Sequence, residues 1–195
     1  MPIVERTPRA CFDVFTAHLR GLVASTVTRR HPIGEVPTRT RLQVGFREEV
    51  PVAVPIDTRF GRLFFYLGQA LEAVPEEGRF RLTTRQYWYR LQQGPTFQEQ
   101  AVIRWEYDTT TDRSEHARHH AQMRATIDVG DGALDLNKAH LPTGWVTIEE
   151  VIRFLIVDLG MTPPCGDDWP DVLEESERMF FEDFTGKRHK PPAEG

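Results

Sequence analysis

Histidines, arginines and carboxylates gather between residues 104 and 124 of the sequence. This segment opens with Arg104-Trp105-Glu106-Tyr107-Asp108 and continues, after a polar turn, with Glu115-His116-Ala117-Arg118-His119-His120. A histidine exchanges protons near neutral pH, and arginines hold a phosphate group and stabilise the charge that develops on it. Metal-independent RNA cleavage needs a base, an acid and cationic contacts to the phosphate. The segment therefore has the side chains for that reaction.

Alternation along two neighbouring segments, 101–107 and 123–129, decides which of these side chains share a face. In both segments apolar residues alternate with polar ones, as they do in strands. If the apolar rows point into the core and the segments pair as a hairpin across residues 109–119, both outward rows lie on one sheet face. The outward residues with a charge or a titratable ring are Arg104, Glu106, Asp108, His120 and Arg124.

These positions predict a role for each member of the cluster. His120 is expected to act as base or acid, with Glu106 as its counterpart. Arg104 and Arg124 are expected to contact the phosphate, because a guanidinium binds phosphate oxygens in pairs. A supporting role is expected for the remaining members, which are Asp108, His116 and His119.

Two other interpretations of the same face stay open. A sheet side that faces solvent is normally charged, and opposite charges paired across strands stabilise it without any function. Alternatively, the histidines could bind a metal together with a nearby aspartate, Asp108 or Asp112. Consecutive histidines on a strand point to opposite faces, however, and their spacing fits no standard zinc or two-metal pattern. We therefore expect neither a metal nor another cofactor.

The aromatic segment Tyr87-Trp88-Tyr89 is a candidate RNA-binding surface. Rings such as those of Tyr87 and Tyr89 can stack on bases, although aromatic residues in a strand more often form the core. The sequence contains no P-loop, GxGxxG, GxSxG or HExxH motif. The common nucleotide-cradling and hydrolase motifs are therefore missing.

The N-terminal part of the chain is predicted to be mostly helical. Apolar residues at helical spacing indicate an amphipathic helix over residues 9–28, and a loop rich in proline and glycine follows to residue 40. A short strand is predicted over residues 42–46. A second helix is predicted over residues 60–74, with Asp57 or Thr58 as its cap.

From residue 79 the spacing of apolar residues becomes that of strands. Residues 79–92 alternate, with a break near residues 83–86 that predicts a bulge, and the segments 101–107 and 123–129 follow. Strands in succession favour antiparallel pairing. We therefore predict an α+β fold in which an antiparallel sheet of about four strands packs against flanking N-terminal and C-terminal helices.

Two further helices are predicted after the sheet. Thr147 and Glu150 form a capping box at the start of the first, and Gly160 ends it. The second, over residues 169–184, is strongly acidic and has an aromatic seam that includes Phe180.

The length of 195 residues suits one core rather than two full domains. We expect a single domain over residues 1–185, followed by a flexible tail at 186–195. Its parts are an N-terminal helical part (1–78), the sheet with the capped helix (79–160) and the acidic helix (167–184).

Charge and cysteine content limit the class of protein. The formal net charge of −5 argues against a broadly basic nucleic-acid coat, although without the acidic helix the body is slightly positive. The N-terminus does not read as a secretory signal, and no apolar stretch is long enough to span a membrane. The two cysteines form no disulfide-like pattern, so a cytoplasmic protein is expected.

Several short motifs follow one another within residues 80–160. They are the aromatic strand Tyr87-Trp88-Tyr89-Arg90-Leu91, the pair Tyr107-Asp108, the histidines His116, His119 and His120, and the helical segment Phe154-Leu155-Ile156-Val157-Asp158-Leu159. Together they resemble the TumE-like family of toxin–antitoxin proteins. The resemblance implies a small toxin-like protein with a ribonuclease-toxin type of α+β fold, with RNA and a cognate antitoxin as partners. Thr109-Thr110-Thr111 departs from the family, where an Asn and a Gly-containing turn are expected, and the first 75 residues and the acidic helix have no counterpart.

The sequence thus predicts a toxin-like bacterial protein that acts as a metal-independent endoribonuclease through its His/Arg/Glu cluster. The alternative is a non-catalytic subunit of a bacterial defence or regulatory assembly, which docks on a protein partner through its acidic C-terminal helix.

Overall fold

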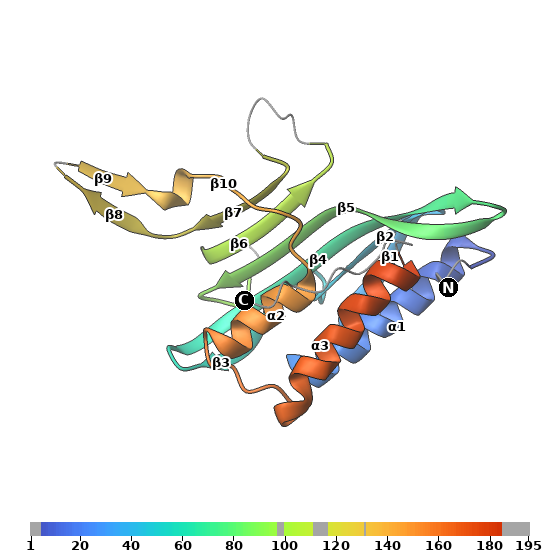
Figure 1. Cartoon of the computed structure of the whole chain (residues 1–195), viewed down its shortest axis with the longest axis horizontal. Helices are drawn as coiled ribbons and strands as arrows, with labels where there is room; N and C mark the ends of the chain where they lie inside the picture. The colour runs from blue at the N-terminus through green and yellow to red at the C-terminus, as the bar shows by residue number, and fades with distance from the viewer. Residues whose placement is uncertain (1–4, 97–99, 111–116, 131, 185–195) are drawn as a thin grey trace.

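The architecture is a large antiparallel sheet with helices on one side. The computed structural model describes residues 5–96, 100–110, 117–130 and 132–184. Within this part of the chain, an eight-stranded sheet carries the three α-helices on one face (Figure 1). The predicted α+β class is confirmed, whereas the sheet has more strands than the four or so expected.

The sheet follows the order β1-β2-β4-β5-β6-β7-β10, and β3 also pairs with β4. Strands β2 and β3 lie one after the other along the same edge of β4, because β2 pairs with residues 68–72 and β3 with residues 61–65. The strands of the sheet are β1 (Ile33–Thr38), β2 (Arg41–Gly45), β3 (Val54–Thr58), β4 (Gly61–Glu76), β5 (Arg79–Gln92), β6 (Ala101–Asp108), β7 (His119–Met123) and β10 (Leu141–Pro142).

The helix predicted over residues 60–74 is wrong, because this segment forms strand β4. Its apolar residues do recur at helical spacing, but most of the positions between them are buried as well. Phe65, Tyr66 and Leu67 are all buried although they point alternately to the two sides of the sheet. A strand covered on both faces gives a continuous apolar run, which spacing alone does not distinguish from a buried helix.

The residues predicted as the cap of that helix, Asp57 and Thr58, are the last two of β3 and lie just before the turn to β4. The hydroxyl of Thr58 donates a hydrogen bond to the carbonyl of Gly61 over 2.8 Å. Gly61 has a φ of +103°, a conformation that glycine adopts without steric cost. The short polar side chain that would cap a helix therefore closes a hairpin here.

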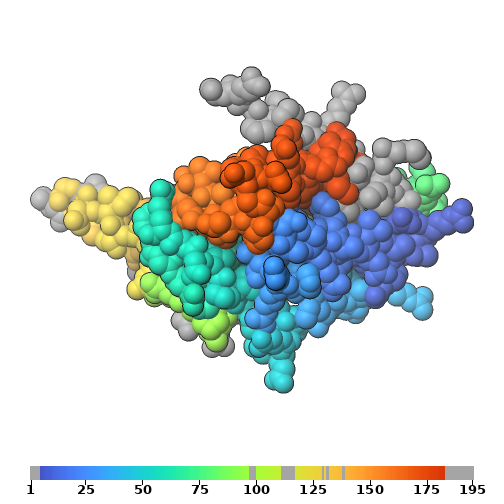
Figure 2. All heavy atoms as spheres, turned by 90° about the horizontal axis from the view of Figure 1, so that it is seen from below, coloured from blue at the N-terminus to red at the C-terminus, as the bar shows by residue number. Residues whose placement is uncertain are grey.

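Two other strand predictions also need correction. Strand β1 lies within residues 29–40, which were expected to be a loop, and forms the sheet edge beside β2. The strand expected over residues 123–129 is divided, because β7 ends at Met123 and β8 (Thr126–Val129) pairs with β9 (Gly132–Asp135) in a separate ribbon. This ribbon projects from the body as an arm, yellow in Figures 1 and 2, and leaves Ile127 48% exposed.

The predicted break in strand β5 is confirmed. The register between β4 and β5 shifts between Ala70 and Leu71, so that Arg85 is an extra residue on β5. A bulge of this kind changes the alternation of the strand. As a result Thr84 and Tyr87, which are three positions apart, both lie on the side that the helices cover.

The predicted helices outside residues 60–74 are confirmed. Helix α1 (Pro8–Thr26) begins after Thr7, whose side chain accepts a hydrogen bond from the backbone of Ala10. Helix α2 (Ile148–Val157) has the expected capping box, in which Thr147 and Glu150 each accept from the other's backbone N–H. Helix α3 (Trp169–Arg178) continues into a π-helical segment, η3 (Met179–Phe184).

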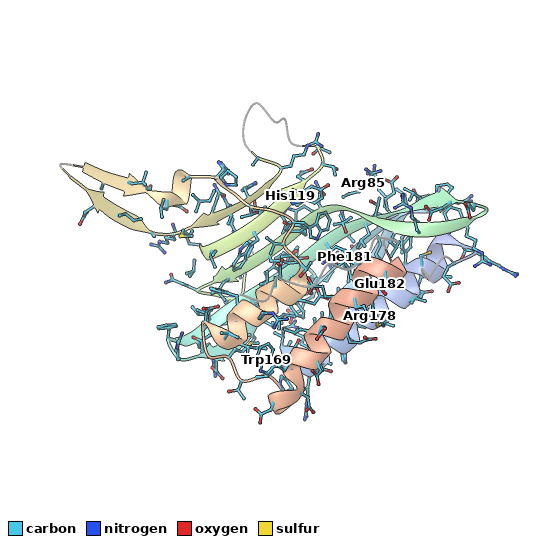
Figure 3. The ribbon with its side chains drawn as sticks, in the orientation of Figure 1. Arg85, His119, Trp169, Arg178, Phe181 and Glu182 are labelled. Carbon is cyan, nitrogen blue, oxygen red and sulfur yellow. The ribbon has the colours of Figure 1, made fainter. Side chains whose placement is uncertain are left out.

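The three helices and the sheet share one hydrophobic core. Helix α3 lies beside α1, and the two are seen side by side in Figures 1 and 2. Trp169 at the start of α3 lies under the guanidinium of Arg153 from α2, 5.5 Å from the ring centre (Figure 3). The first 78 residues, predicted to be mostly helical, form one helix and four strands in their described part, and α1, β2, β3 and β4 contribute residues to this core.

Candidate functional site

The sheet has two faces with different surroundings, which we call the helix face and the open face. Trp105 identifies the helix face, because its ring contacts Phe154 of α2 at 5.6 Å between centroids. The open face is the opposite side, and in the described part of the chain none of the three α-helices covers it (Figure 1). By strand alternation the polar residues Arg104 and Glu106 lie on the open face.

One continuous row of paired residues crosses the whole open face, and we call it the central row. From one edge of the sheet to the other, it contains an isoleucine, two glycines, a tryptophan, a glutamate, a histidine and a proline. Each member is the direct cross-strand partner of the next. The row consists of Ile33, Gly45, Gly68, Trp88, Glu106, His120 and Pro142.

The structure brings together three of the four residues predicted to be catalytic. His120 Nε2 lies 3.5 Å from one carboxylate oxygen of Glu106, and Arg104 Nε lies 3.7 Å from the other. His120 Nδ1 is 3.0 Å from the carbonyl oxygen of Ala117. Since a carbonyl only accepts hydrogen bonds, Nδ1 carries a proton and Nε2 faces the carboxylate. The Glu106 side chain therefore has a cation on one side and an imidazole on the other.

His120 itself is too deeply buried to meet a substrate, because only 5% of its surface is exposed. Its ring makes an edge-to-face contact with the ring of His140, at 4.8 Å between centroids. His140 is exposed, and the Glu106 side chain is partly exposed. A substrate on the open face can therefore reach Glu106 and His140, while His120 lies behind them. We call these three residues the Glu–His–His array.

The sequence suggests only that His140 could approach the sheet, and a structural role is the simpler interpretation of it there. It precedes the two-residue strand β10, whose pairing with β7 places Pro142 opposite His120. No local pattern predicts so short a strand, because two residues cannot show the alternation of apolar and polar positions. The only signal was a histidine just before a proline-containing loop.

The remaining members of the predicted cluster lie apart from the array. Arg124 follows the end of β7, and its guanidinium is 3.5 Å from the side-chain oxygen of Gln93. His119 lies on the helix face, where its ring stacks on Tyr107 at 4.1 Å. Burial, and next the neighbouring His120, lower the pKa of His119. His116 lies outside the described residues, as does Asp112.

Asp108 closes the turn that follows β6. Its carboxylate accepts hydrogen bonds from the side chain of Gln86 and from the backbone and hydroxyl of Thr110, all at 2.7 Å. Burial alone would raise the pKa of Asp108, but these hydrogen bonds together outweigh it and lower the pKa. Asp108 is thus an ionised residue that holds the turn in place.

Tyr87 and Tyr89, the predicted base-stacking residues, belong to the core instead. They are 1% and 2% exposed, and their rings stack on each other at 4.8 Å. The Tyr87 hydroxyl accepts a hydrogen bond from the backbone of Val146, and burial raises the pKa of Tyr87 to about 12. The residue between them, Trp88, points to the open face and is half-buried. It is the aromatic residue of this strand that a ligand on the open face can meet.

A pocket of about 210 Å³ adjoins Trp88 on the open face. Its floor includes Gly45 and Gly68, which face each other across β2 and β4. A Cβ on Gly45 would lie 2.6 Å from the carbonyl oxygen of Leu67, so only glycine fits this close approach of the two strands. Tyr66 and Arg47 also line the pocket. It combines aromatic walls, a floor without side chains and an arginine that pairs with Glu35.

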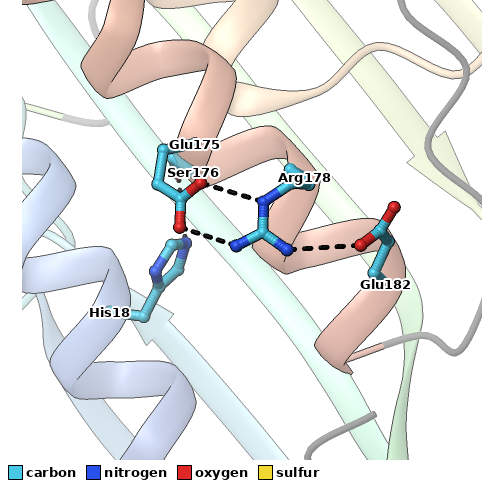
Figure 4. A network of polar contacts seen from close by, with 5 residues as sticks. All are labelled: His18, Glu175, Ser176, Arg178 and Glu182. Carbon is cyan, nitrogen blue, oxygen red and sulfur yellow. Dashed lines mark hydrogen bonds and ion pairs between the residues drawn. The ribbon is translucent and has the colours of Figure 1, made fainter. Parts of the chain in front are cut away.

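The two faces of the molecule differ in charge. The open face has Arg90 on β5, Arg104 on β6 and Arg47 after the end of β2. Arg104 pairs with Glu106, and Arg47 pairs with Glu35. On the far side, exposed carboxylates of α3 and the turn before it are opposed by Arg178 alone, which pairs with Glu175 and Glu182 (Figure 4). Among the described residues, no group of three histidine, cysteine or acidic side chains is placed to hold a metal ion.

Comparison of the chain with protein-family models, with curated proteins and with solved structures found no match. The resemblance to TumE-like toxins therefore stays a prediction. No helix in the described ranges is both long and apolar enough to cross a membrane.

Proposed function

We propose that the open face binds single-stranded RNA and that the Glu–His–His array cleaves it without a metal. The central row is the observation that carries this proposal. It places an aromatic ring, a carboxylate and a histidine on consecutive strands, beside a pocket of about 210 Å³.

Binding follows from the two neighbouring rows of the open face. A base stacked on Trp88 gains about 1 to 3 kcal/mol, as bases do on aromatic platforms in single-strand binding proteins. The adjoining row contains Tyr66, Arg90 and Arg104 as direct cross-strand partners. These arginines lie one row from Trp88, which is where the phosphates of a stacked strand would run.

Cleavage follows from the two accessible ends of the array. Glu106 takes the proton from the ribose 2′-hydroxyl, and the 2′-oxygen forms a bond to phosphorus. The bond from phosphorus to the 5′-oxygen breaks, and His140 in its protonated form gives that oxygen a proton. Arg104 stabilises the charge on the phosphoryl oxygens. His120 acts as a positioning residue, because it is held by Ala117 and contacts both ends.

The proposal is tested with a labelled single-stranded RNA in EDTA. Glu106→Gln and His140→Ala should each reduce cleavage by about 10²- to 10⁴-fold, the usual contribution of a general acid or base. Glu174→Gln and His31→Ala are matched controls, because both residues are exposed and lie away from the array. An RNA with 2′-deoxyribose at the cleaved position should bind and stay intact.

Three results would overturn the enzymatic proposal. They are an absence of cleavage of every RNA tested, equal cleavage of the 2′-deoxy RNA, and undiminished cleavage by both array variants. RNA binding is tested separately with Trp88→Ala, which should weaken binding about 5- to 100-fold if one base stacks on the ring.

The alternative, docking through the acidic C-terminal helix, has weaker support. Its aromatic seam is packed inside the molecule, where Phe180 contacts Phe15 at 6.5 Å and Trp145 at 6.5 Å. Leu173 on the same side of α3 is fully buried. Only the outward carboxylates are left for a partner, and charge alone gives little affinity at physiological salt.

A further inference from the structure

A second pocket lies on the helix face, between the sheet and the C-terminal helical segment. Its outer part has a volume of about 210 Å³ and is lined by Tyr107, Trp145, Phe180 and Phe181, with Arg81 and Thr83 at one side. Its inner part, about 10 Å³, is lined by Gln69, Tyr89, Thr147 and Glu149. The two parts adjoin, because Thr84, Trp145 and Phe180 line both.

Aromatic rings dominate the outer part. The ring of Trp145 lies 5.1 Å from that of Tyr107 and 6.5 Å from that of Phe180, and Phe181 follows at 5.5 Å from Phe180. In the view of Figure 3, Phe181 lies at the end of the helical segment nearest the sheet. Aromatic faces attract cations as well as flat apolar groups. The one cation of the lining, Arg81, is paired with Glu76 at 3.0 Å, so its charge is compensated.

The inner part offers hydrogen-bond acceptors. Gln69 is 5% exposed, and its amide nitrogen donates to the hydroxyl of Tyr89 over 2.6 Å. Among the described residues, its amide oxygen accepts no hydrogen bond. A buried acceptor without a donor is unfavourable, and a ligand with a donor would remove that cost. The second acceptor is the buried carboxyl of Glu149, and the lining of the inner part includes no basic side chain.

We propose that this pocket binds a small primary amine with an aromatic or apolar body. The body lies among Tyr107, Trp145 and Phe181, and the ammonium group points to Gln69 and Glu149. An ammonium has three donors and no acceptor, which matches acceptors that need donors. The inner volume has the size of one water molecule, which suits one ammonium group. An acid would bring two carboxylates together, and an alcohol would leave Glu149 without a counterion.

The surroundings of Glu149 predict how binding depends on pH. Burial raises the pKa of Glu149 to about 7, partly offset by the hydrogen bond that Ser176 donates over 2.5 Å. Glu177 of α3 adds negative charge nearby, and His18 of α1 contacts the same Ser176 hydroxyl. Glu150, the next residue of α2, lies close to Glu177 and to the cation Arg153. An ammonium group stabilises the ionised carboxylate. The amine should therefore bind more tightly at pH 8 than at pH 6.

The test is a calorimetric titration of the whole chain with phenethylamine, 2-phenylethanol and 3-phenylpropionate. We expect the amine to bind at least tenfold more tightly than the alcohol, and the acid to bind more weakly still. Glu149→Gln keeps an acceptor for Ser176 and should reduce amine affinity at least tenfold at pH 8. Phe181→Ala should reduce the affinity for both amine and alcohol.

The control variant is Phe60→Ala, because Phe60 is an exposed aromatic residue in the turn between β3 and β4 and does not line this pocket. Its affinity for the amine should equal that of the unmodified chain. The inference is overturned if the amine does not bind, if the alcohol or the acid binds as tightly, or if Phe181→Ala and Glu149→Gln leave its affinity unchanged. None of these results depends on RNA binding at the open face.

Discussion

The two faces of one sheet show how far the environment of neighbouring residues can differ. Tyr89 is buried on the helix face, where its ring makes apolar contacts and its hydroxyl accepts a hydrogen bond from Gln69. Trp88 lies on the open face among charged side chains. Alternation alone separates them, since successive side chains of a strand point to opposite sides. The same sheet therefore supports a dry core on one side and a polar candidate site on the other.

The carboxyl groups on the two faces have different neighbours and different contact with solvent. On the open face, Glu106 lies within ion-pair distance of both Arg104 and His120 and keeps contact with solvent. On the helix face, Glu149 is enclosed and has hydroxyl groups as its hydrogen-bond donors. A carboxylate with cations nearby stays available for chemistry, whereas a carboxyl without one is favoured in its neutral form. This contrast predicts where pH changes stability and where it changes activity.

The largest difference is expected between adjacent substitutions on β5. Tyr89→Ala should lower the free energy of unfolding by about 3 to 5 kcal/mol, the range for removing a large buried aromatic side chain. Trp88→Ala should lower it by about 1 kcal/mol or less, because the ring is only partly enclosed. Urea unfolding of both variants measures the two values. Equal losses would mean that the open face is covered by part of the chain or by a partner.

The next effect is a pH dependence that comes from Glu149. The pKa of this carboxyl is 4.5 in the unfolded chain and about 7 in the folded protein. The protein therefore has its full stability below pH 4.5 and loses stability as the pH rises through 7. The loss amounts to about 3 kcal/mol at pH 8. In Glu149→Gln this loss is absent, and the variant should be more stable than the unmodified chain at pH 8 but not at pH 5. Urea unfolding at both pH values would refute the prediction if the two proteins changed in parallel.

A smaller effect is expected from the cap of helix α2, which supports the helix-face pocket. Thr147→Ala removes the acceptor for the backbone N–H of Glu150 and should cost about 1 kcal/mol. Thr147→Ser keeps the hydroxyl and should restore most of that stability. Thermal unfolding of the two variants gives the comparison, and the prediction fails if serine is no better than alanine.

The smallest effect is expected at the outer surface of α3. Arg178 donates to Glu175 and Glu182, and these hydrogen bonds raise its pKa (Figure 4). All three side chains are exposed to solvent, so water and salt screen their attraction. Arg178→Ala should therefore leave the melting temperature unchanged within error. A clear decrease would indicate that this surface is covered in the folded protein.

Local patterns were sufficient where one element can be recognised by its own residues. Helix α2 was predicted from Thr147 and Glu150, because a capping box needs only four consecutive positions. The bulge near Arg85 was visible as a break in alternation. The placement of Arg104 and Glu106 on one face with His120 followed from strand period, because a slip of one residue would have inverted every side chain.

Patterns failed where the surroundings of an element decide its structure. Strand β4 reads as a helix because both of its sides are apolar, and only the pairing with β2, β3 and β5 fixes it as a strand. The division at residue 123 was equally invisible, since the alternation continues from β7 into the arm. In both cases the pairing between strands, rather than the pattern within one segment, fixes the structure.

The sequence by itself determined the α+β class, the helices at both ends and the face on which the charged residues of β6 and β7 lie, since these depend on local spacing. Only the tertiary structure decided that His120 is buried and that His140 comes to lie against it. It also placed Gln69 and Glu149 at the inner end of an aromatic pocket. Such sites depend on contacts between residues far apart in the chain, and those contacts are set by packing rather than by spacing.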